Sequence, residues 1–372
     1  HAPLADKDLY DFFTRTLGQL ARLGQVTLSD ELEEMRQFEE PQVSVHTKGG
    51  LLDISFDFST VFENDIDDAL EALFKNQPYF VNGSGKLVVF DEETQRVSST
   101  LQNLRAKQLD NGHLQLDAIS AFQISDLFQG NDRISFSKEF EQLAHDLTHP
   151  EEFEVTLPPL QTQLRDYQMT GVRWMSMLDY YGFGGILADD MGLGKTLQTI
   201  AFLVSHLKEK TRILILSPSS LIYNWKDEFT RFAPEIDVAV SYGLKAVRDE
   251  IIAENHQVVI TSYSSFRQDF AEYNQLNFDY LILDEAQVMK NIQTKIAHYL
   301  RQFEVKNCFA LSGTPIENKL LEIWSIFQIV LPGLLPDKKH FLKMVMPNKS
   351  HDLSSRLLCV VAKKKFCQSC QI

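Results

Sequence analysis

The sequence predicts an α/β domain with a mainly parallel sheet, preceded by a region of mixed α+β structure. After residue 155, short apolar segments alternate with helical ones, which is typical of a parallel sheet buried on both faces. Before that point, strand and helix patterns follow one another without this alternation. Pro158-Pro159 cannot continue a helix and marks the change. We therefore expect an α+β region at 1–155 and the α/β domain at 156–347.

Four segments of the first region have a clear secondary-structure pattern. Apolar residues at helical spacing predict a helix from Leu9 to Leu23, and alternation predicts a strand over 51–58. Residues 66–75 have a helical pattern. The segments 79–81 and 86–90 flank a glycine-containing turn and predict a hairpin. We find no catalytic constellation in this region.

The second region contains five apolar segments of strand length. They are 185–188, 213–216, 258–260, 280–283 and 308–311. Ligands of open parallel sheets bind at the carboxyl ends of the strands. The residues that follow these five segments are therefore the candidates for function.

Composition and charge are those of a folded chain with two unlike parts. Of the 372 residues, 44% are apolar and 23% charged, which excludes disorder over the whole length. Residues 1–155 hold 29 acidic and 12 basic side chains, whereas 156–372 hold 22 and 24. The net charge of −15 thus says little about what the second region binds. No apolar run is long enough for a transmembrane helix, so we expect no membrane partner.

Metal-binding patterns are sparse. Cys367 and Cys370 form one C-x-x-C pair, which supplies only half of a zinc site. His145 and His149 are four residues apart on an expected helix, where a surface helix is favoured over a zinc pair. We therefore expect no structural metal.

A glycine-rich loop and then a helical segment follow the first strand. Gly192 and Gly194 let backbone N–H groups curl toward a phosphate, and the helix N-terminus adds partial positive charge. In such a loop, Lys195 reaches the β- and γ-phosphates and Thr196 places its hydroxyl on Mg²⁺. The strand before and the helix after favour this interpretation over a surface turn, although Asp189 stands at the first glycine position.

Two further strands end in residues suited to the same chemistry. Asp284 follows the fourth strand and suits a magnesium-holding carboxylate, and the adjacent Glu285 could orient or deprotonate an attacking water. Ser312, Gly313 and Thr314 follow the fifth strand, where hydroxyls could sense the phosphate state. Without the glycine loop, the acids would be better explained as a solvated turn, and a simple turn at the fifth strand stays equally open.

Six motifs carry these residues in order. They are Leu-Arg-Asp-Tyr-Gln, Asp-Asp-Met-Gly-Leu-Gly-Lys-Thr, Ser-Pro-Ser-Ser-Leu-Ile-Tyr-Asn-Trp, Thr-Ser-Tyr, Asp-Glu-Ala-Gln and Leu-Ser-Gly-Thr-Pro-Ile-Glu-Asn. Over about 160–345 the chain resembles the first motor lobe of the Swi/Snf family of DNA-dependent ATPases, a branch of helicase superfamily two. The resemblance implies a RecA-like phosphate-loop fold. Residues 1–155 resemble, far less specifically, the accessory region of bacterial members.

For the nucleotide, the resemblance implies ATP with Mg²⁺. Gln168 corresponds to the residue that recognises adenine, and Asp284 and Glu285 correspond to the catalytic acids that bind magnesium and activate water. The residues expected at the phosphates are Gly192, Leu193, Gly194, Lys195 and Thr196, with Lys195 also catalytic and Thr196 also holding the metal.

For nucleic acid, the resemblance implies duplex DNA bound without sequence specificity. The expected contacts, or supports of contacts, are Ser219, Thr261, Ser262 and Lys290. Ser312, Gly313 and Thr314 would couple ATP to DNA. Gln287 stands where this family usually has His, so the coupling step is where this chain departs from the pattern.

The second motor lobe, with its charge-stabilising arginine, has no counterpart after Pro347. Family members continue with a segment like P-F-x-x-R-R-x-K-x-x-V-x-x-x-L-P. Codons can be chosen for residues 357–372 that, read in a neighbouring frame, spell Phe-Val-Met-Arg-Arg-Ser-Lys-Glu-Glu-Val-Leu-Pro. We therefore expect 348–372 to be an aberrant tail, out of frame from about 352, which would make its cysteine pair an accident.

The expected function of the full-length parent is ATP-driven translocation on duplex DNA in the bacterial cytoplasm, at the nucleoid. For the 372 residues alone we expect ATP binding with little turnover. Two alternatives stay open: an RNA helicase lobe of the same superfamily, and a truncated remnant without catalysis. The sequence names no protein partner.

Overall fold

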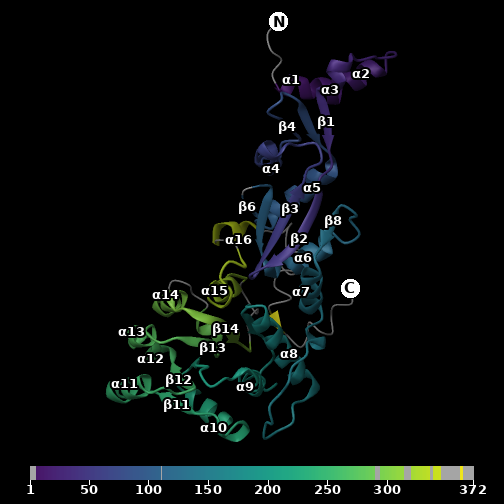
Figure 1. Cartoon of the computed structure of the whole chain (residues 1–372). Helices are drawn as coiled ribbons and strands as arrows, with labels where there is room; N and C mark the ends of the chain where they lie inside the picture. The colour runs from purple at the N-terminus through teal and green to yellow at the C-terminus, as the bar shows by residue number, and fades with distance from the viewer. Residues whose placement is uncertain are drawn as a thin grey trace. The chain divides into compact units, whose positions relative to one another are not determined.

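A computed structural model describes residues 6–109, 111–289, 294–313, 320–335, 338–344 and 361–362. Internal contacts divide the chain into two units, 1–143 and 144–372. This division falls inside α7 (Lys138–Thr148), earlier than the boundary expected near residue 155. In Figure 1 the colour runs from purple in the first unit to yellow late in the second.

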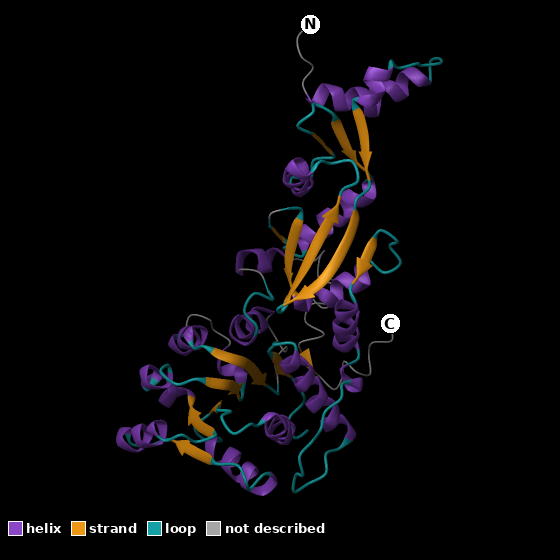
Figure 2. Cartoon of the chain, viewed as in Figure 1, coloured by secondary structure: helices purple, strands orange, loops and turns teal. Residues whose placement is uncertain are grey.

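The first unit contains two sheets, drawn in orange in Figure 2. The larger has the strand order β6-β7-β3-β2-β8. In it β3 is antiparallel to both β2 and β7, and β8 is parallel to β2. The bounds are β2 Gln42–Lys48, β3 Leu51–Asp57, β6 Lys107–Gln108, β7 His113–Asp117 and β8 Ile134–Phe136. The strand expected at 51–58 is therefore confirmed as β3.

The smaller sheet has the order β1-β5-β4. The expected hairpin is confirmed, because β4 (Tyr79–Val81) pairs antiparallel with β5 (Leu87–Phe90). A third strand, β1 (Arg36–Glu39), pairs parallel with β5, and the sequence pattern had not revealed it.

Short helices complete the first unit. The helix expected at 9–23 is present, although a π-helical turn interrupts it, and the one expected at 66–75 is α4. The bounds are α1 Asp6–Asp11, the π turn Phe12–Thr16, α2 Leu17–Ala21, α3 Asp30–Glu34, α4 Ile66–Phe74, α5 Glu92–Asn103 and α6 Ala121–Leu127, with 3₁₀ turns at Glu63–Asp65 and Ala118–Ser120. Leu9 and Phe13 pack on Leu87 and Val89, which joins the first helices to β5.

Seven parallel strands form the sheet of the second unit, in the order β11-β12-β10-β13-β14-β9-β15 (Figure 1). The bounds are β9 Gly185–Leu187, β10 Ile213–Ser217, β11 Val238–Ser241, β12 Val258–Ser262, β13 Phe278–Leu283, β14 Val305–Leu311 and β15 Val361–Ala362. All five expected strands are confirmed. The sequence analysis missed β11, an edge strand whose alternate residues are only half-buried and which lacks the continuous apolar run of the inner strands.

Helices of the second unit cover this sheet. α8 packs against α9, and α15 packs against β14 and β9. Their bounds are α8 Asp166–Tyr180, α9 Lys195–His206, α10 Ile222–Phe232, α11 Lys245–Ala253, α12 Tyr263–Gln268, α13 Phe270–Tyr273, α14 Lys295–Gln302, α15 Leu320–Val330 and α16 Lys338–Met344, with 3₁₀ turns at Pro150–Glu152 and Ala286–Met289. Phe202 of α9 meets Tyr280 and Phe309 edge-on at centroid distances of 5.6 and 5.1 Å, which places the core between α9 and the sheet.

Among the described residues, no helix is both long and apolar enough to cross a membrane. The expected tail lies outside the described residues, apart from the two residues of β15, so its out-of-frame origin stays a prediction.

The register of the sheet aligns the carboxyl ends of β9, β10, β13 and β14 at the same height, and we call this edge of the sheet the level edge. Leu216 of β10 pairs with Leu283 of β13, and Leu283 pairs with Ala310 of β14. Leu311 in turn pairs with Leu187 of β9. The segments that follow these strands therefore meet at one edge of the sheet, where the sequence places its candidate residues.

Gly184 permits the close packing of β9 beneath this edge. A Cβ atom at this position would lie 2.1 Å from the carbonyl oxygen of Val330 and 2.4 Å from that of Cys308. Both atoms belong to backbone that cannot turn aside. We therefore expect that glycine alone fits here.

Gly184→Ala should lower the free energy of unfolding of the second unit by about 3 kcal/mol or more, because the clash forces backbone to shift. Gly333→Ala is the matched control, since a Cβ there meets nothing within 4 Å. The cost of an alanine at this position comes from its φ angle of +96°. The control should cost about 1 kcal/mol. Urea titrations followed by tryptophan fluorescence measure both, because all three tryptophans lie in the second unit. Equal losses in the two variants would contradict the packing account.

Candidate nucleotide site

The glycine loop joins β9 to α9 at the level edge of the sheet. Gly192 and Gly194 have φ angles of 82° and 75°, in the left-handed region that favours glycine. Gly194 is the N-cap of α9, so the helix begins at Lys195. The first N–H groups of such a helix have no partner within it, which makes its start a binding place for anions.

Gln168, the expected adenine reader, lies against this loop. It is buried at the start of α8, where its Oε1 accepts from the Arg165 N–H at 3.0 Å. Its Nε2 donates to the carbonyl oxygen of Leu193 at 3.3 Å. A Cβ at Gly194 would lie 2.6 Å from that Nε2. The structure thus brings Gln168 together with the predicted phosphate loop.

Lys195 is turned back onto the loop that carries it. Its Nζ donates to the carbonyl oxygens of Asp189 and Asp190 at 2.8 and 3.2 Å. Burial lowers the pKa of Lys195, against the opposing charges of four carboxylates: Asp189, Glu285, Asp284 and Asp190. These opposing charges show that Lys195 and the acids after β13 share one electrostatic site. Thr196, the second residue of α9, is half-buried beside it.

Asp284 is fixed from three sides. Its Oδ2 accepts from the Ser217 hydroxyl at 2.8 Å and from Trp225 Nε1–H at 2.9 Å, and its Oδ1 accepts from the Glu285 N–H at 3.0 Å. The Tyr263 hydroxyl donates to its carbonyl oxygen at 2.7 Å. Burial raises the pKa of Asp284, although the bonds from Trp225 and Ser217 oppose this. The carboxylate is therefore held in one orientation in a site that penalises its charge.

Glu285 has a strained backbone and a defined partner. Its φ of 48° lies in the left-handed region, which a residue with a side chain adopts at a cost of about 1–3 kcal/mol. Its carboxylate accepts a hydrogen bond from the side-chain amide of Gln287. The carbonyl of the same amide accepts from the Ser312 hydroxyl at 2.9 Å. Gln287 thus connects the acid after β13 with the residue after β14.

Two of the three residues expected to couple ATP to DNA are described. Ser312 is buried, and its N–H donates to the carbonyl oxygen of Leu187 at 3.1 Å. Gly313 lies close to the glycine loop, because a Cβ there would be 2.9 Å from the side chain of Met191. Thr314 lies outside the described residues. The end of β14 therefore contacts both the loop and the acid motif.

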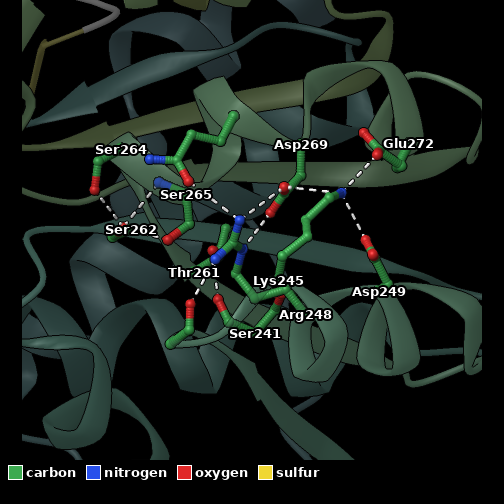
Figure 3. Close-up of polar contacts among 12 residues, drawn as sticks. Ser241, Lys245, Arg248, Asp249, Thr261, Ser262, Ser264, Ser265, Asp269 and Glu272 are labelled. Carbon is green, nitrogen blue, oxygen red and sulfur yellow. Dashed lines mark hydrogen bonds and ion pairs between the residues drawn. The ribbon is translucent and has the colours of Figure 1, made fainter.

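The residues expected at DNA are placed differently from one another. Ser219 is exposed after β10, whereas Thr261 and Ser262 at the end of β12 are buried. The Thr261 hydroxyl donates to the carbonyl oxygen of Ser241 at 2.7 Å, and Ser262 Oγ accepts from the Ser265 N–H at 3.1 Å (Figure 3). Both residues were expected to contact DNA or to support such contacts, and this expectation stays a prediction.

Lys290 lies outside the described residues, so its expected DNA contact stays a prediction.

Ion pairs brace the same end of the sheet. Arg248 of α11 is buried and donates to both oxygens of Asp269 at 2.5 and 3.0 Å (Figure 3). Burial raises the pKa of Asp269, but the bonds from Arg248 and Lys245 outweigh this and hold it below its usual range. The oxygens of Asp249, Asp269 and Glu272 are close enough together for a metal, but the Lys245 Nζ contacts all three at 2.6, 3.1 and 2.6 Å. The lysine already supplies the positive charge that a cation would bring.

The sequence offered two other metal-binding patterns, a histidine pair and a cysteine pair. The rings of His145 and His149 stack at a centroid distance of 4.6 Å, and His145 is half exposed. His145 lies on α7, whereas His149 follows its last residue, so the two are not on one helix as expected. Cys367 and Cys370 lie outside the described residues.

Sequence reasoning missed the residues that hold Asp284 in place. Ser217 and Trp225 are the first and last residues of the motif Ser-Pro-Ser-Ser-Leu-Ile-Tyr-Asn-Trp, but the sequence assigned neither to Asp284. Their role depends on β10 and β13 being neighbours, which the sequence pattern does not reveal. The one available signal was the polar Ser217 at the end of an otherwise apolar strand.

Fold and site together define an ATP-binding lobe of the RecA-like, phosphate-loop class. The family model for the SNF2-related domain matches residues 167–367, more than half of the chain. The model for the bacterial SNF2 helicase-associated region matches residues 4–158. The chain belongs to the SNF2 family.

Similar proteins occur in bacteria. An uncharacterized ATP-dependent helicase of Mycoplasma pneumoniae is 33% identical over 96% of this chain and 36% of its own length. YwqA of Bacillus subtilis, a putative ATP-dependent helicase/translocase, is 36% identical over 72% of this chain and 30% of its own length. The chain thus spans about a third of the length of these relatives.

Solved structures are similar to this chain as well, and one example supports the fold. It is the SWI2/SNF2 ATPase core of Sulfolobus solfataricus in complex with double-stranded DNA. The two share 34% identity and a TM-score of 0.52, over 57% of this chain and 47% of that one. The RecA-like α/β fold is therefore confirmed.

Asp284→Asn should change how stability depends on pH. The folded-state pKa of Asp284 lies above its ordinary value of 3.8, so the stability that this group adds below that value is lost as the pH rises through the folded-state pKa. The wild type should therefore lose stability relative to the variant as the pH rises above about 4. Urea titrations followed by tryptophan fluorescence at several pH values measure the difference.

The matched control is Asp227→Asn, an exposed aspartate on α10, the helix that carries Trp225. Its stability difference from wild type should stay flat over the same range. A flat difference for Asp284→Asn as well would contradict the account of a buried, charge-penalised carboxylate.

Proposed function

We propose that the second unit is the ATP-binding first motor lobe of a DNA-dependent ATPase that moves along duplex DNA. The observation that carries the proposal is the register of the parallel sheet, because the strand before the Lys195 loop and the strand before Asp284 and Glu285 end at the same level. A cation beside paired carboxylates, at the start of a helix, is suited to bind and cleave a triphosphate with a metal ion.

The residues at the sheet edge fit a magnesium ion. Four carboxylates act on Lys195, and burial raises the pKa of Asp284, so the site favours additional positive charge. Thr196 and Asp284 would hold the ion, since hydroxyl and carboxylate oxygens are the ligands it prefers. When bound, Mg²⁺ would neutralise charge on the phosphates.

The chain's own residues would then share the work of hydrolysis. Lys195 would leave the carbonyl oxygens of Asp189 and Asp190 and pair with the β- and γ-phosphates. Glu285 would orient the attacking water and accept its proton, and Gln168 would bind adenine through its amide. Within this proposal Gly192, Leu193 and Gly194 supply backbone N–H groups to the phosphates.

Gln287 would connect ATP to DNA. Its amide bonds both Glu285 and Ser312, so a shift of Glu285 on cleavage would reach the end of β14. Where the family usually has a histidine, this chain has Gln287, whose amide N–H donates to Glu285 and whose amide oxygen accepts from Ser312. The proposal thus assigns Gln287, Ser312 and the adjoining Gly313 and Thr314 to coupling.

Duplex DNA is the proposed partner. The solved ATPase core of Sulfolobus solfataricus is in complex with double-stranded DNA. Exposed Ser219 would contact phosphate oxygens together with Lys290, while buried Thr261 and Ser262 would support this edge from within. Contacts to phosphates give binding without sequence specificity.

The proposed organisation is an accessory region at 1–155, this lobe at 156–347, and a second lobe outside the present chain that supplies an arginine. We further propose that the parent protein works at the nucleoid in the bacterial cytoplasm.

The 372-residue chain should bind ATP with Mg²⁺ in calorimetric titration, and Lys195→Ala should weaken binding by roughly tenfold or more because one charged contact to phosphate is lost. Lys208→Ala, an exposed lysine just beyond the other end of α9, is the matched control and should bind as wild type. Turnover with duplex DNA should stay low in all three. DNA-stimulated turnover lost in Lys195→Ala would show that one lobe suffices, and stronger stimulation by RNA would favour an RNA helicase.

Gln287→Ala should separate binding from coupling. In the full-length parent, ATP affinity should change by less than about twofold, while stimulation of turnover by duplex DNA should fall by about tenfold, since the bridge between Glu285 and Ser312 is lost. Steady-state ATPase assays with and without DNA measure this. Unchanged stimulation would contradict the proposed relay.

A further inference from the structure

Gln198 is a buried polar residue that no motif of the sequence analysis used. It lies in the first turn of α9, three residues after Lys195, and is fully buried. Its Nε2 donates to Asp189 Oδ2 at 3.2 Å and lies 3.4 Å from the carbonyl oxygen of Leu193. Helical side chains point back toward the helix N-terminus, which is why Gln198 reaches the loop before its own helix.

Asp189 is the other end of this contact, and it stands where a strict phosphate loop has its first glycine. Its side chain is buried, and its carbonyl oxygen accepts from Lys195 Nζ at 2.8 Å. The Asp189 carboxylate and the amide of Gln198 therefore clamp the start of the loop to the first turn of α9.

Gln198 also contacts the helix that carries the adenine reader. Its Oε1 has no hydrogen-bond partner among the described residues and faces Gly171 of α8, where an added Cβ would lie only 1.9 Å away. Gly171 is three residues after Gln168, on the same face of α8. Gln168 and Gln198 both donate to the carbonyl oxygen of Leu193. Gln198 thus touches the loop, Asp189 and α8 at once.

We propose that Gln198 and Asp189 are positioning residues that set Gln168 relative to the phosphate loop, and so determine the preference for ATP over other nucleoside triphosphates. The inference rests on the proposed function, because it assumes that Gln168 binds adenine while the loop binds phosphates. Loss of the clamp removes one of the two donors to the Leu193 carbonyl and lets α8 shift. ATP then loses its base contact, whereas GTP, which never makes that contact, loses little.

The test compares the dissociation constants of ATP and GTP in calorimetric titrations of the 372-residue chain with Mg²⁺. Gln198→Met keeps the length of the side chain but removes its hydrogen bonds. It should weaken ATP binding about tenfold and GTP binding less than about threefold, so the selectivity ratio falls. The matched control is Gln123→Met, a buried glutamine of α6 in the first unit, which should leave the ratio unchanged.

Asp189→Asn tests the other end of the contact. If Gln198→Met no longer unfolds cooperatively, Asp189→Asn is the variant that tests the inference. This change also removes a negative charge near Lys195, but ATP and GTP carry the same triphosphate, so that effect cancels in their ratio. The ratio should fall by about threefold. In the double variant it should equal that of Gln198→Met alone, because both act through one hydrogen bond.

The outcomes separate the inference from the proposed function. A wild type that binds neither nucleotide overturns both. A wild type that prefers ATP, with variants that keep the ratio or weaken ATP and GTP equally, overturns the inference alone. Reductions of the ratio that multiply in the double variant also overturn it, since the two residues would then act separately.

Discussion

The balance of charge at the level edge of the parallel sheet governs the rest of the site. The ammonium of Lys195 is exposed to the charges of four carboxylates, and its hydrogen bonds go to the carbonyl oxygens of its own loop. Burial makes this arrangement costly, because it lowers the pKa of Lys195 and raises that of Asp284. A triphosphate with a divalent cation would bring both the anion that Lys195 needs and the positive charge that the acids need.

The surrounding structure keeps these opposing groups in place. Hydrogen bonds from Ser217 and Trp225 hold the Asp284 carboxylate in place. The next residue, Glu285, has its backbone in the left-handed region. From Glu285 the amide of Gln287 continues to Ser312, so two side-chain hydrogen bonds link the acid after β13 to the residue after β14. Such bonds can exchange partners without unfolding a helix or strand, which suits the proposed cycle of hydrolysis.

The sequence predicted what is encoded in short, contiguous segments. The glycine loop, the acids after the fourth strand and the five apolar strands all have local signatures, and the structure places them at one edge. The partners of Asp284 could not be predicted from the sequence, because Ser217 and Trp225 reach its carboxylate only where β10 and β13 are neighbours. The burial of Thr261 and Ser262 was likewise not predictable, because it follows from the position of β12 inside the sheet. No sequence pattern identifies Gln198, because a glutamine one turn into a helix has no signature of its own.

Hydrogen–deuterium exchange of the backbone amides tests the central claim most directly. If the level edge is one preorganised triphosphate site, ATP with Mg²⁺ should slow exchange at residues 190–196 and at 284–287 together, because the loop N–H groups bind phosphate and the acids bind the ion. The same nucleotide without Mg²⁺ should protect the first segment more than the second. Unchanged exchange in both segments, or protection confined to residues outside this edge, would contradict the account.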